Sequence, residues 1–446
     1  VTIETMGVKT MAIIMRSCKF YCILVIGGLF LIPHLKASDS AKPDRKYVKE
    51  IKKLADHPKI KQAFKRIEEL ESTTHDNLVY LTEIPAPPFK ESIRAKAFSE
   101  LLKNAGADEV FIDGEGNVVA RRDGTGKKTV LIEGHLDTVF PEGTDVTVRT
   151  HGDTLFAPGV GDDTRGLSLI ITLLQAVNDA DIRTDATLYF AGTVGEEGLG
   201  DLRGVKHLFN SNDISVDSYI AVDGGGLDRI VTTAVGSHRY RTTFKGPGGH
   251  SWGAFGLVNP HHALGRAIEY FTAEADPYSR TAGKKVSYNV GRIGGGTSVN
   301  SIPFESWMEV DMRSVSPERL QKMDDIFQNA VQKALQDQNT LGRTDAQMTV
   351  DMDMVGNRPA GSADEKNPLV QRAMASIDYL SGKPRLGSGS TNSNIPFSRN
   401  IPAITIGRGG TGRHGHSLNE WWLNKDGHLA IQNALLILVS QADGIQ

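Results

Sequence analysis

The sequence has few cysteines, no large excess of either charge and no long apolar run. Its 446 residues include two cysteines, Cys18 and Cys22, both near the N-terminus. The formal charge of -3 argues against a protein that binds nucleic acid by neutralising phosphates. With 23% charged and 39% hydrophobic residues, the chain does not match a disordered, collagenous or polytopic membrane protein. At roughly 150 residues per domain, the length suggests two or three domains.

The longest apolar segment near the N-terminus is short for a membrane span. Residues 15–19 carry positive charge, residues 20–33 are almost wholly apolar, and Ala37 precedes a polar stretch. This order is typical of a secretory signal peptide, and an apolar run of about 14 residues falls short of the roughly 20 that cross a bilayer as a helix. We therefore expect cleavage near Ala37 and export to the periplasm or medium, without stable membrane association. An uncleaved N-terminal anchor is the alternative.

Beyond residue 37 the chain contains no cysteine, and two familiar motifs are missing. A metal site in this part of the chain must therefore use histidine and carboxylate ligands. The HEXXH motif of single-zinc proteases does not occur. The segment GTGKKT at 124–129 is not a phosphate loop, because Arg121 stands where that loop needs its leading glycine.

Short apolar runs rich in branched residues alternate with helical patterns through much of the chain. Apolar strands that alternate with helices favour an α/β fold with a mainly parallel sheet and helices on both faces. The predicted strands are 129–134, 186–194, 218–224 and 403–407.

Between residues 237 and 355 the pattern changes to β-α-β-β-α-β, which predicts a compact α+β module. Because the last predicted core strand follows this segment, the module is inserted into the α/β domain. We therefore divide the chain into residues 1–37, which hold the signal and upstream residues, the first part of the α/β domain at 38–236, the module at 237–355, and the second part of the α/β domain at 356–446.

Histidine and acidic residues follow each of the four predicted core strands. Open α/β sheets bind ligands at the carboxyl ends of their strands, so these side chains should converge. A further acidic pair precedes the helical pattern after residue 164. The residues concerned are His135 and Asp137, Asp162 and Asp163, Glu196 and Glu197, Asp223, and His414, His416 and Glu420.

Carboxylates and imidazoles that converge without thiols suit two zinc ions, or manganese or cobalt in the same ligands. Taken singly, each acidic residue is more typical of a helix cap, a turn or a solvated surface than of a metal ligand, so only the convergence favours metal. His135 and Asp137 share one side of a strand, where Asp137 can hold the second ring nitrogen. Of Glu196 and Glu197, one can bind metal while the other takes a proton from water.

The motifs GHLDTV, GVGDDTRG, TVGEEG, AVDGGG and HSLNE occur in this order around the inserted module. Together they resemble the co-catalytic zinc aminopeptidase and carboxypeptidase superfamily, which includes peptidase T, carboxypeptidase G and acyl-amino-acid deacylases. The resemblance spans essentially all of the chain after the signal. It implies a zinc-exopeptidase-like fold in which the module serves as a lid and dimerisation domain.

The same resemblance assigns roles to the residues of these motifs. It makes Asp162 a bridge between two metals, with His135 and Asp223 on one metal and Glu197 and His416 on the other. Glu196 becomes the general base, and Asp137 orients His135. His416 is preferred over His414 because Glu420 follows it by four residues, as in the family's ending. A cis peptide bond between Asp162 and Asp163 is also implied.

The resemblance extends to residues that would contact substrate. His250 matches a lid histidine that reaches an active site, often across a dimer, and stabilises the oxyanion. Asn300 and Arg313 resemble contacts to a substrate carboxylate or carbonyl, although a strand salt bridge is an equal reading of Arg313. Asn392 lies in a loop suited to binding a substrate terminus, where the family commonly has Asp.

The expected function is therefore metal-assisted hydrolysis of amide bonds. We expect a di- or tripeptide exopeptidase that uses a metal-bridging hydroxide with Glu196 as the base, and that forms a homodimer through the module. An N-acyl-amino-acid deacylase is the alternative within the enzymes. A peptide-binding protein that holds metal without catalysis is a more remote third.

Overall fold

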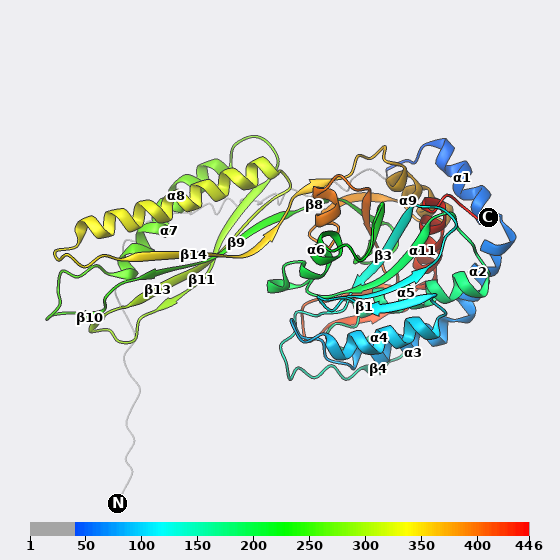
Figure 1. Cartoon of the computed structure of the whole chain (residues 1–446), viewed down its shortest axis with the longest axis horizontal. Helices are drawn as coiled ribbons and strands as arrows, with labels where there is room; N and C mark the ends of the chain where they lie inside the picture. Colours follow the sequence, from blue (N-terminus) through cyan, green and yellow to red (C-terminus); the bar gives the residue numbers. More distant parts are fainter. Residues whose placement is uncertain (1–40, 446) are drawn as a thin grey trace, which may run out of the picture. The chain divides into compact units, whose positions relative to one another are not determined.

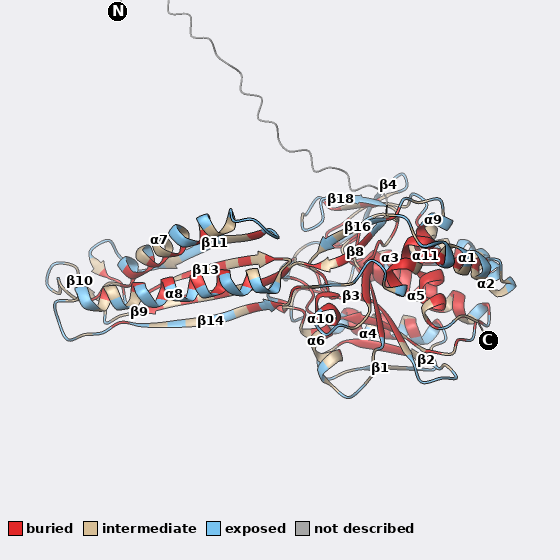
Figure 2. Ribbon diagram, turned by 90° about the horizontal axis from the view of Figure 1, so that it is seen from above, coloured by how far each residue is buried: buried red, intermediate tan, exposed pale blue. Residues whose placement is uncertain are grey.

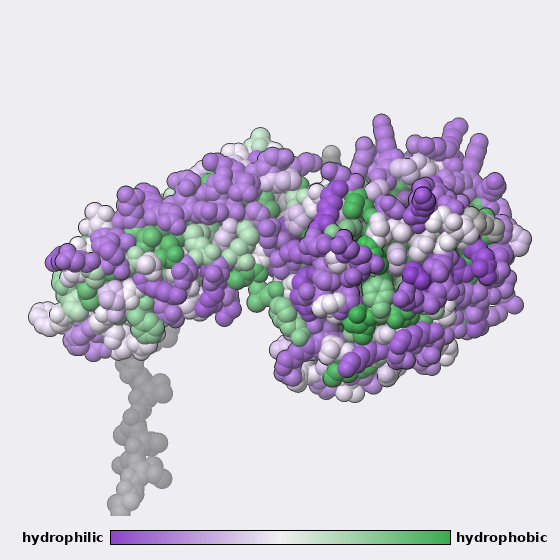
Figure 3. Space-filling view, viewed as in Figure 1, coloured by the Kyte–Doolittle hydropathy of each residue, from purple (hydrophilic) through white to green (hydrophobic). Residues whose placement is uncertain are grey.

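The computed structural model describes residues 41–445 of the chain (Figure 1). The predicted signal segment and the cleavage near Ala37 lie outside the described residues. Within the described range, no helix combines the length and the apolar character needed to cross a bilayer. The surface seen in Figure 3 is largely hydrophilic, with apolar residues scattered across it.

The main sheet has nine strands, and the four at its centre run parallel in the order β6-β3-β7-β17. These are β6 (Thr187–Thr193), β3 (Thr129–His135), β7 (Ser218–Val222) and β17 (Ala403–Ile406), which confirm the four predicted strands. The other strands are β1 (Glu109–Ile112), β2 (Val118–Arg122), β8 (Arg229–Ala234), β15 (Gly361–Ser362) and β16 (Arg385–Gly389). Apart from the parallel pair of β16 with β8, these strands pair antiparallel with their neighbours, so the sheet is parallel where it is most buried.

Helices cover both faces of this sheet (Figure 2). Consecutive strand residues point to opposite faces, so Val130 and Ile132 pack with one layer of helices while Leu131 packs with the other. Each leucine or isoleucine buried this way stabilises the fold by about 1.5–3 kcal/mol. The first layer contains α4 (Ser92–Asn104), α5 (Thr164–Asp179), α9 (Pro368–Tyr379) and α11 (His428–Gln441), and the second contains α6 (Arg203–Asn210) and α10 (Asn394–Ser398).

Further helices and a small sheet complete this part of the fold. The N-terminal helices α1 (Arg45–Ala55), α2 (Pro58–Glu69) and α3 (Glu71–Thr82) pack outside the first helical layer. The small antiparallel sheet joins β4 (Arg149–His151), β5 (Thr154–Phe156), β18 (Thr411–Arg413) and β19 (Trp421–Leu423). It therefore brings the chain before α5 close to the chain after β17.

The inserted segment forms a second sheet with its own core. Four long antiparallel strands follow the order β11-β13-β9-β14, with two helices against one face. Along β13 every second residue is buried, as expected for a sheet covered on one side. The elements are β9 (Gly236–Lys245), α7 (Pro260–Ser279), β11 (Val286–Gly295), β13 (Glu305–Ser314), α8 (Pro317–Leu341) and β14 (Thr349–Arg358).

The long elements of this module therefore follow the predicted β-α-β-β-α-β order. One addition is a short ribbon in which β10 (Gly249–His250) pairs with β12 (Ser301–Ile302). We call the residues from β9 to β14 the module. Its roles as a lid and in dimerisation stay predictions.

Candidate metal centre

Five of the predicted acidic residues and histidines line one cavity of about 500 Å³, and they are Asp162, Glu196, Glu197, Asp223 and His416. His135 is the last residue of β3, Asp223 follows β7, and Glu196 and Glu197 follow β6 closely. Asp162 arrives on the loop before α5 and His416 on the loop after β18. Parallel strands end at the same edge of a sheet, which is why residues so far apart in sequence converge here.

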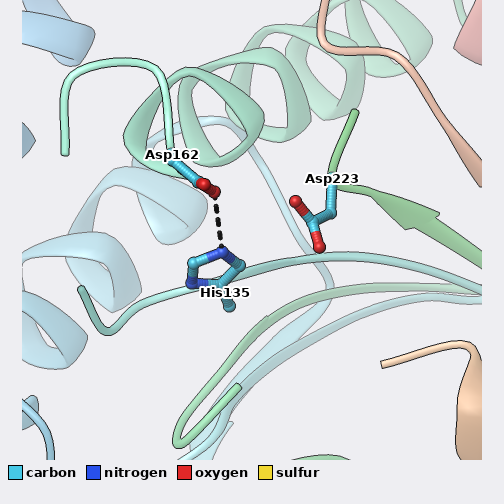
Figure 4. Close-up of side chains that lie close together, drawn as sticks. All are labelled: His135, Asp162 and Asp223. Carbon is cyan, nitrogen blue, oxygen red and sulfur yellow. Dashed lines mark hydrogen bonds and ion pairs between the residues drawn. The ribbon is translucent and has the colours of Figure 1, made fainter. Parts of the chain in front are cut away.

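Asp162 lies between two histidines and offers one oxygen to each. Its Oδ1 is 3.2 Å from His135 Nε2, and its Oδ2 is 3.3 Å from His416 Nε2. Figure 4 shows the His135 ring and the Asp162 carboxylate facing each other, with Asp223 beside them. This position is the one required of a carboxylate that bridges two ions.

Two sets of ligand atoms share Asp162. Within each set the atoms lie no more than 4.8 Å apart, and the sets are His135, Asp162 and Asp223, and Asp162, Glu197 and His416. These are the two halves that the family resemblance implied. A third set of the same size joins His135 with Glu196 and Glu197, which places Glu196 at the same centre.

The donors fit a pair of divalent ions. Three carboxylates and two imidazoles are suitable ligands for zinc and for manganese or cobalt. Hydrogen bonds to Asp162 and Glu197 raise the pKa of His416 to about 10, and its Nε2 lies 2.8 Å from Glu197 Oε1. A bound ion would take the place of the proton that these groups share.

A buried glutamate fixes the loop that carries Asp162. Glu420 Oε1 accepts hydrogen bonds from the main-chain N–H groups of Gly161 and Asp162, both at 2.9 Å. Its Oε2 accepts from Gly159 N at 2.8 Å. The peptide bond between Asp162 and Asp163 is cis, as the resemblance implied. The glutamate of the HSLNE motif therefore positions the bridging carboxylate.

Asp137 is fully buried and does more than orient His135. Its Oδ1 and Oδ2 accept hydrogen bonds from the main-chain N–H groups of Glu196 and Glu197, at 3.0 and 2.8 Å. The His135 Nδ1 lies 2.9 Å from the main-chain oxygen of Asp137 and 3.7 Å from its carboxylate. The expected contact to the ring is thus made mainly by the carbonyl, while the carboxylate holds both glutamates in place.

Glu196 is buried beside Arg358. The Arg358 Nη1 lies 3.2 Å from Glu196 Oε1, and its Nη2 donates to the main-chain oxygen of Glu196. Burial raises the pKa of Glu196 well above its usual value, and Arg358 opposes that rise only in part. The carboxylate is held at the cavity wall and can accept a proton readily.

Arg408 is a cation among the acidic ligands that the sequence analysis did not single out. Its Nη1 lies 3.1 Å from Asp162 Oδ1, 3.0 Å from Asp163 Oδ1 and 3.5 Å from Asp223 Oδ1. Burial alone would raise the pKa of Asp162, but Arg408 and then the two histidines hold it well below its usual range. Only the three-dimensional approach of the loop after β17 to Asp162 reveals this contact.

Four predicted substrate or oxyanion residues fall in different places. Arg313 lines the cavity. Asn392 does not, because it is buried and its Nδ2 donates to Glu133 and Thr193, at 3.1 and 2.8 Å. This placement corrects the expectation that Asn392 contacts substrate.

His250 and Asn300 lie on the module near the ribbon of β10 and β12, and both are exposed. Among the described residues, no contact joins either of them to the cavity of the same chain. That Asn300 contacts substrate stays a prediction. His250 Nδ1 accepts from the main-chain N–H groups of Trp252 and Gly253, both at 3.2 Å.

Comparison with known proteins places these observations in context. The model of peptidase family M20/M25/M40 matches residues 131–436. The uncharacterized protein YqjE of Bacillus subtilis is 24% identical over 325 residues, which cover 70% of this chain and 83% of YqjE.

Two solved structures have a similar fold. The aminopeptidase PepT of Bacillus cereus aligns with a TM-score of 0.66 and 20% identity, over 82% of this chain and 97% of that one. The YXEP protein of Bacillus subtilis, a dinuclear metal-binding peptidase, aligns with a TM-score of 0.61 and 17% identity, over 85% and 100% of the two chains.

Proposed function

The chain belongs to the peptidase family M20/M25/M40 and is a metal-dependent hydrolase, and we propose that it hydrolyses amide bonds of short peptides with two zinc ions. One observation carries this proposal above the others. The two oxygens of Asp162 face two different histidines, so the chain can hold two ions side by side. The same proposal includes export from the cytoplasm, which the signal-like residues 1–37 support.

In this proposal His135 and Asp223 hold one ion, Glu197 and His416 hold the other, and Asp162 joins them. When bound, such ions polarise the scissile carbonyl and acidify the attacking water. Asp137 contributes by fixing the main chain of Glu196 and Glu197, so that the ligand and the base keep their separation. Glu420 contributes by fixing the Asp162 loop.

Glu196 is proposed as the general base. It removes a proton from water as the water oxygen bonds to the carbonyl carbon, and it delivers that proton to the nitrogen as the carbon–nitrogen bond breaks. General acid–base catalysis of this kind contributes about 10²–10⁴-fold to the rate. Arg358 supports the role of Glu196 as the base, because it donates hydrogen bonds to the carboxylate and to the main-chain oxygen of Glu196 and so holds this residue in place.

His250 is proposed to stabilise the oxyanion at the site of a second copy of the chain. The support is its position, because it is exposed and the nearby side chains of Trp252 and Phe255 are 87% and 71% exposed. Exposed apolar side chains grouped in this way mark interaction surfaces. A homodimer formed through the module would cover them.

The size of the cavity supports a short substrate. About 500 Å³ falls within the range of about 300–1,000 Å³ that small-molecule sites occupy. The test is incubation of the purified chain with a mixed library of di- and tripeptides and N-acyl amino acids, with zinc and with a chelator. Zinc-dependent release of amino acids from peptides, read by mass spectrometry, supports the proposal. Release of acyl groups alone would identify a deacylase, and no hydrolysis would contradict the proposal.

A further inference from the structure

Five arginines line the metal cavity beside the candidate ligand His416. They are Arg229, Arg239, Arg313, Arg358 and Arg408. Arg408 forms ion pairs with the candidate ligands Asp162 and Asp223 and with Asp163. The other four surround the space in front of the metal centre. Arginine is suited to this position because its planar guanidinium binds a carboxylate through two parallel hydrogen bonds.

Three of these arginines come from the end of the module sheet. Strand register places Arg358 of β14 and Arg313 of β13 directly opposite Ser237 of β9, one on each side. Arg239 lies two residues further along β9 and so faces the same side of the sheet. The module therefore presents a compact group of guanidinium groups to the cavity. Arg229 reaches the same cavity from the start of β8 in the main sheet.

The carboxylates near these four arginines neutralise only part of their charge. Arg239 and Arg313 share Asp311, at 2.9 and 2.7 Å. Arg358 pairs with Glu196.

Arg229 donates to the main-chain oxygen of Ser388 at 2.8 Å, and within the described part of the chain it pairs with no carboxylate. Four cations thus face two anions, and the wall of the cavity stays positive.

The rest of the lining offers little to an apolar side chain. Apart from the charged groups, the cavity is lined by Val139 and Val231 and otherwise by glycine, serine and threonine. A large aliphatic or aromatic side chain would desolvate guanidinium groups without pairing them, which costs free energy. A second carboxylate would instead find partners.

We propose that Arg229 and Arg239 form a second anion subsite beside Arg313, and that the preferred substrates therefore carry two carboxylates on one residue. In such a substrate the α-carboxylate meets Arg313, while the side-chain carboxylate meets Arg229 and Arg239. The chemical class is a short peptide that ends in aspartate or glutamate, or the N-acyl derivative of such an amino acid. This inference rests on the proposed function for its reaction, but its binding component stands separately.

The kinetic test compares isosteric pairs with the zinc-loaded full chain. Ala-Glu is compared with Ala-Gln, and N-acetylglutamate with N-acetylglutamine, so that each pair differs in one charge. We expect kcat/KM to favour the acidic member by about 10–100-fold, the range expected from hydrogen bonds to a charged group. The peptide and the acylated arms also tell the two sources of the dicarboxylate apart. Equal rates within both pairs would overturn the proposal.

Substitutions of single arginines test which of them cause the preference for the acidic substrate. Arg229→Gln should reduce the preference for the acidic member about tenfold. Arg385→Gln is the matched control, because Arg385 is a nearby exposed arginine that pairs with Asp228 and does not line the cavity. A loss of preference in the control alone, or in neither variant, would contradict the assignment.

Arg239→Met is the second variant, with Arg241→Met as its control. Arg241 lies two residues further along β9, pairs with Glu309 and stacks on Trp307 outside the cavity. Because Arg239 Nη1 also donates to Gly198 O, next to the ligand Glu197, zinc content is measured for each variant to confirm an intact site. If Arg239→Met loses zinc, Arg239→Lys, which keeps the charge but not the two-pronged hydrogen bonding, takes its place. A preference unchanged in a zinc-loaded Arg239 variant would contradict the role of Arg239.

A binding test does not depend on catalysis. Calorimetry with L-glutamate and L-glutamine on the zinc-loaded chain should show glutamate binding about tenfold tighter or more, and Arg229→Gln should remove most of that difference. If no amide is hydrolysed but glutamate still binds selectively, the proposed function fails and the anion subsite stands. If amides are hydrolysed but glutamate and glutamine bind equally, the subsite fails and the proposed function stands.

Discussion

The module lines the cavity with three arginines, whereas the main sheet and its loops supply all of the acidic side chains, together with Arg229 and Arg408. The main sheet, with the loops beside it, brings the acidic ligands together from parallel strand ends far apart in sequence. The module brings arginines together through the register of antiparallel neighbours. We therefore assign the chemistry of the site to the main sheet and propose that the recognition of substrate belongs mainly to the module.

The largest expected effect comes from removing the general base supplied by the main-sheet side of the cavity. Glu196→Gln should lower kcat by at least about 10²–10⁴-fold while the zinc content of the chain stays unchanged, because Glu196 moves a proton and does not hold metal. Steady-state kinetics and metal analysis by mass spectrometry measure the two quantities. Glu274→Gln, an exposed change on α7, is the control. Retained turnover in Glu196→Gln would disprove the assigned base.

A second effect tests whether the module contributes to catalysis. His250→Ala should lower kcat by about 10²–10³-fold, the usual loss when one oxyanion donor is removed. Mixing it with Glu196→Gln should restore about a quarter of wild-type activity, because half of the chains pair as mixed dimers and each has one intact site. Size-exclusion chromatography with light scattering tests for the dimer. Full activity in His250→Ala, or no recovery in the mixture, would contradict a shared site.

A third change sharpens the role of the loops beside the main sheet. Glu420 accepts hydrogen bonds from three main-chain N–H groups of the Asp162 loop. In Glu420→Gln the side-chain NH₂ would face one of these donors instead of an acceptor oxygen, so the loop should become less well fixed. Zinc affinity should fall about 10–100-fold, as it does when partners that hold metal ligands are removed. Competition with a chelating dye measures the affinity. An unchanged zinc affinity would show that Glu420 is not needed to position Asp162.

The smallest effect concerns pH. The pKa of His416 is raised to about 10 without metal, so below that pH a bound ion must displace its proton. Zinc affinity should therefore rise with pH, by on the order of tenfold per unit for each proton released. The same dye competition between pH 6 and pH 8 measures the slope. An affinity independent of pH would contradict the shared proton between His416 and its two carboxylate neighbours.

The sequence was sufficient to predict that the candidate ligands converge, because most of them lie beside a clear strand or helix signal. Apolar runs ending at His135, at Glu196 and at Asp223 gave the parallel strands, and parallel strands place their ends together. The family resemblance added the cis bond at Asp162 and the division into two halves. The order of elements in the module followed from its alternating strand pattern.

The residues that the sequence did not reveal depend on packing between distant segments. Arg408 meets Asp162 only because the loop after β17 approaches the loop before α5. Arg313 and Arg358 flank Ser237 because β13 and β14 pair with β9 on its two sides, and the sequence does not show which strands are neighbours. The loop around Asn392 suggested a contact with substrate, but in the structure the Asn392 amide donates to the buried Glu133.

If Asp162 holds two ions together, the number of ions bound per chain tests this most directly. Zinc per chain, measured by mass spectrometry after equilibrium dialysis, should be two for the wild type and one for His416→Ala. It should be much lower than two for Asp162→Asn, because that change weakens both halves together. A wild-type chain that binds a single ion, or an Asp162→Asn chain that still binds two with unchanged affinity, would contradict the bridged metal centre.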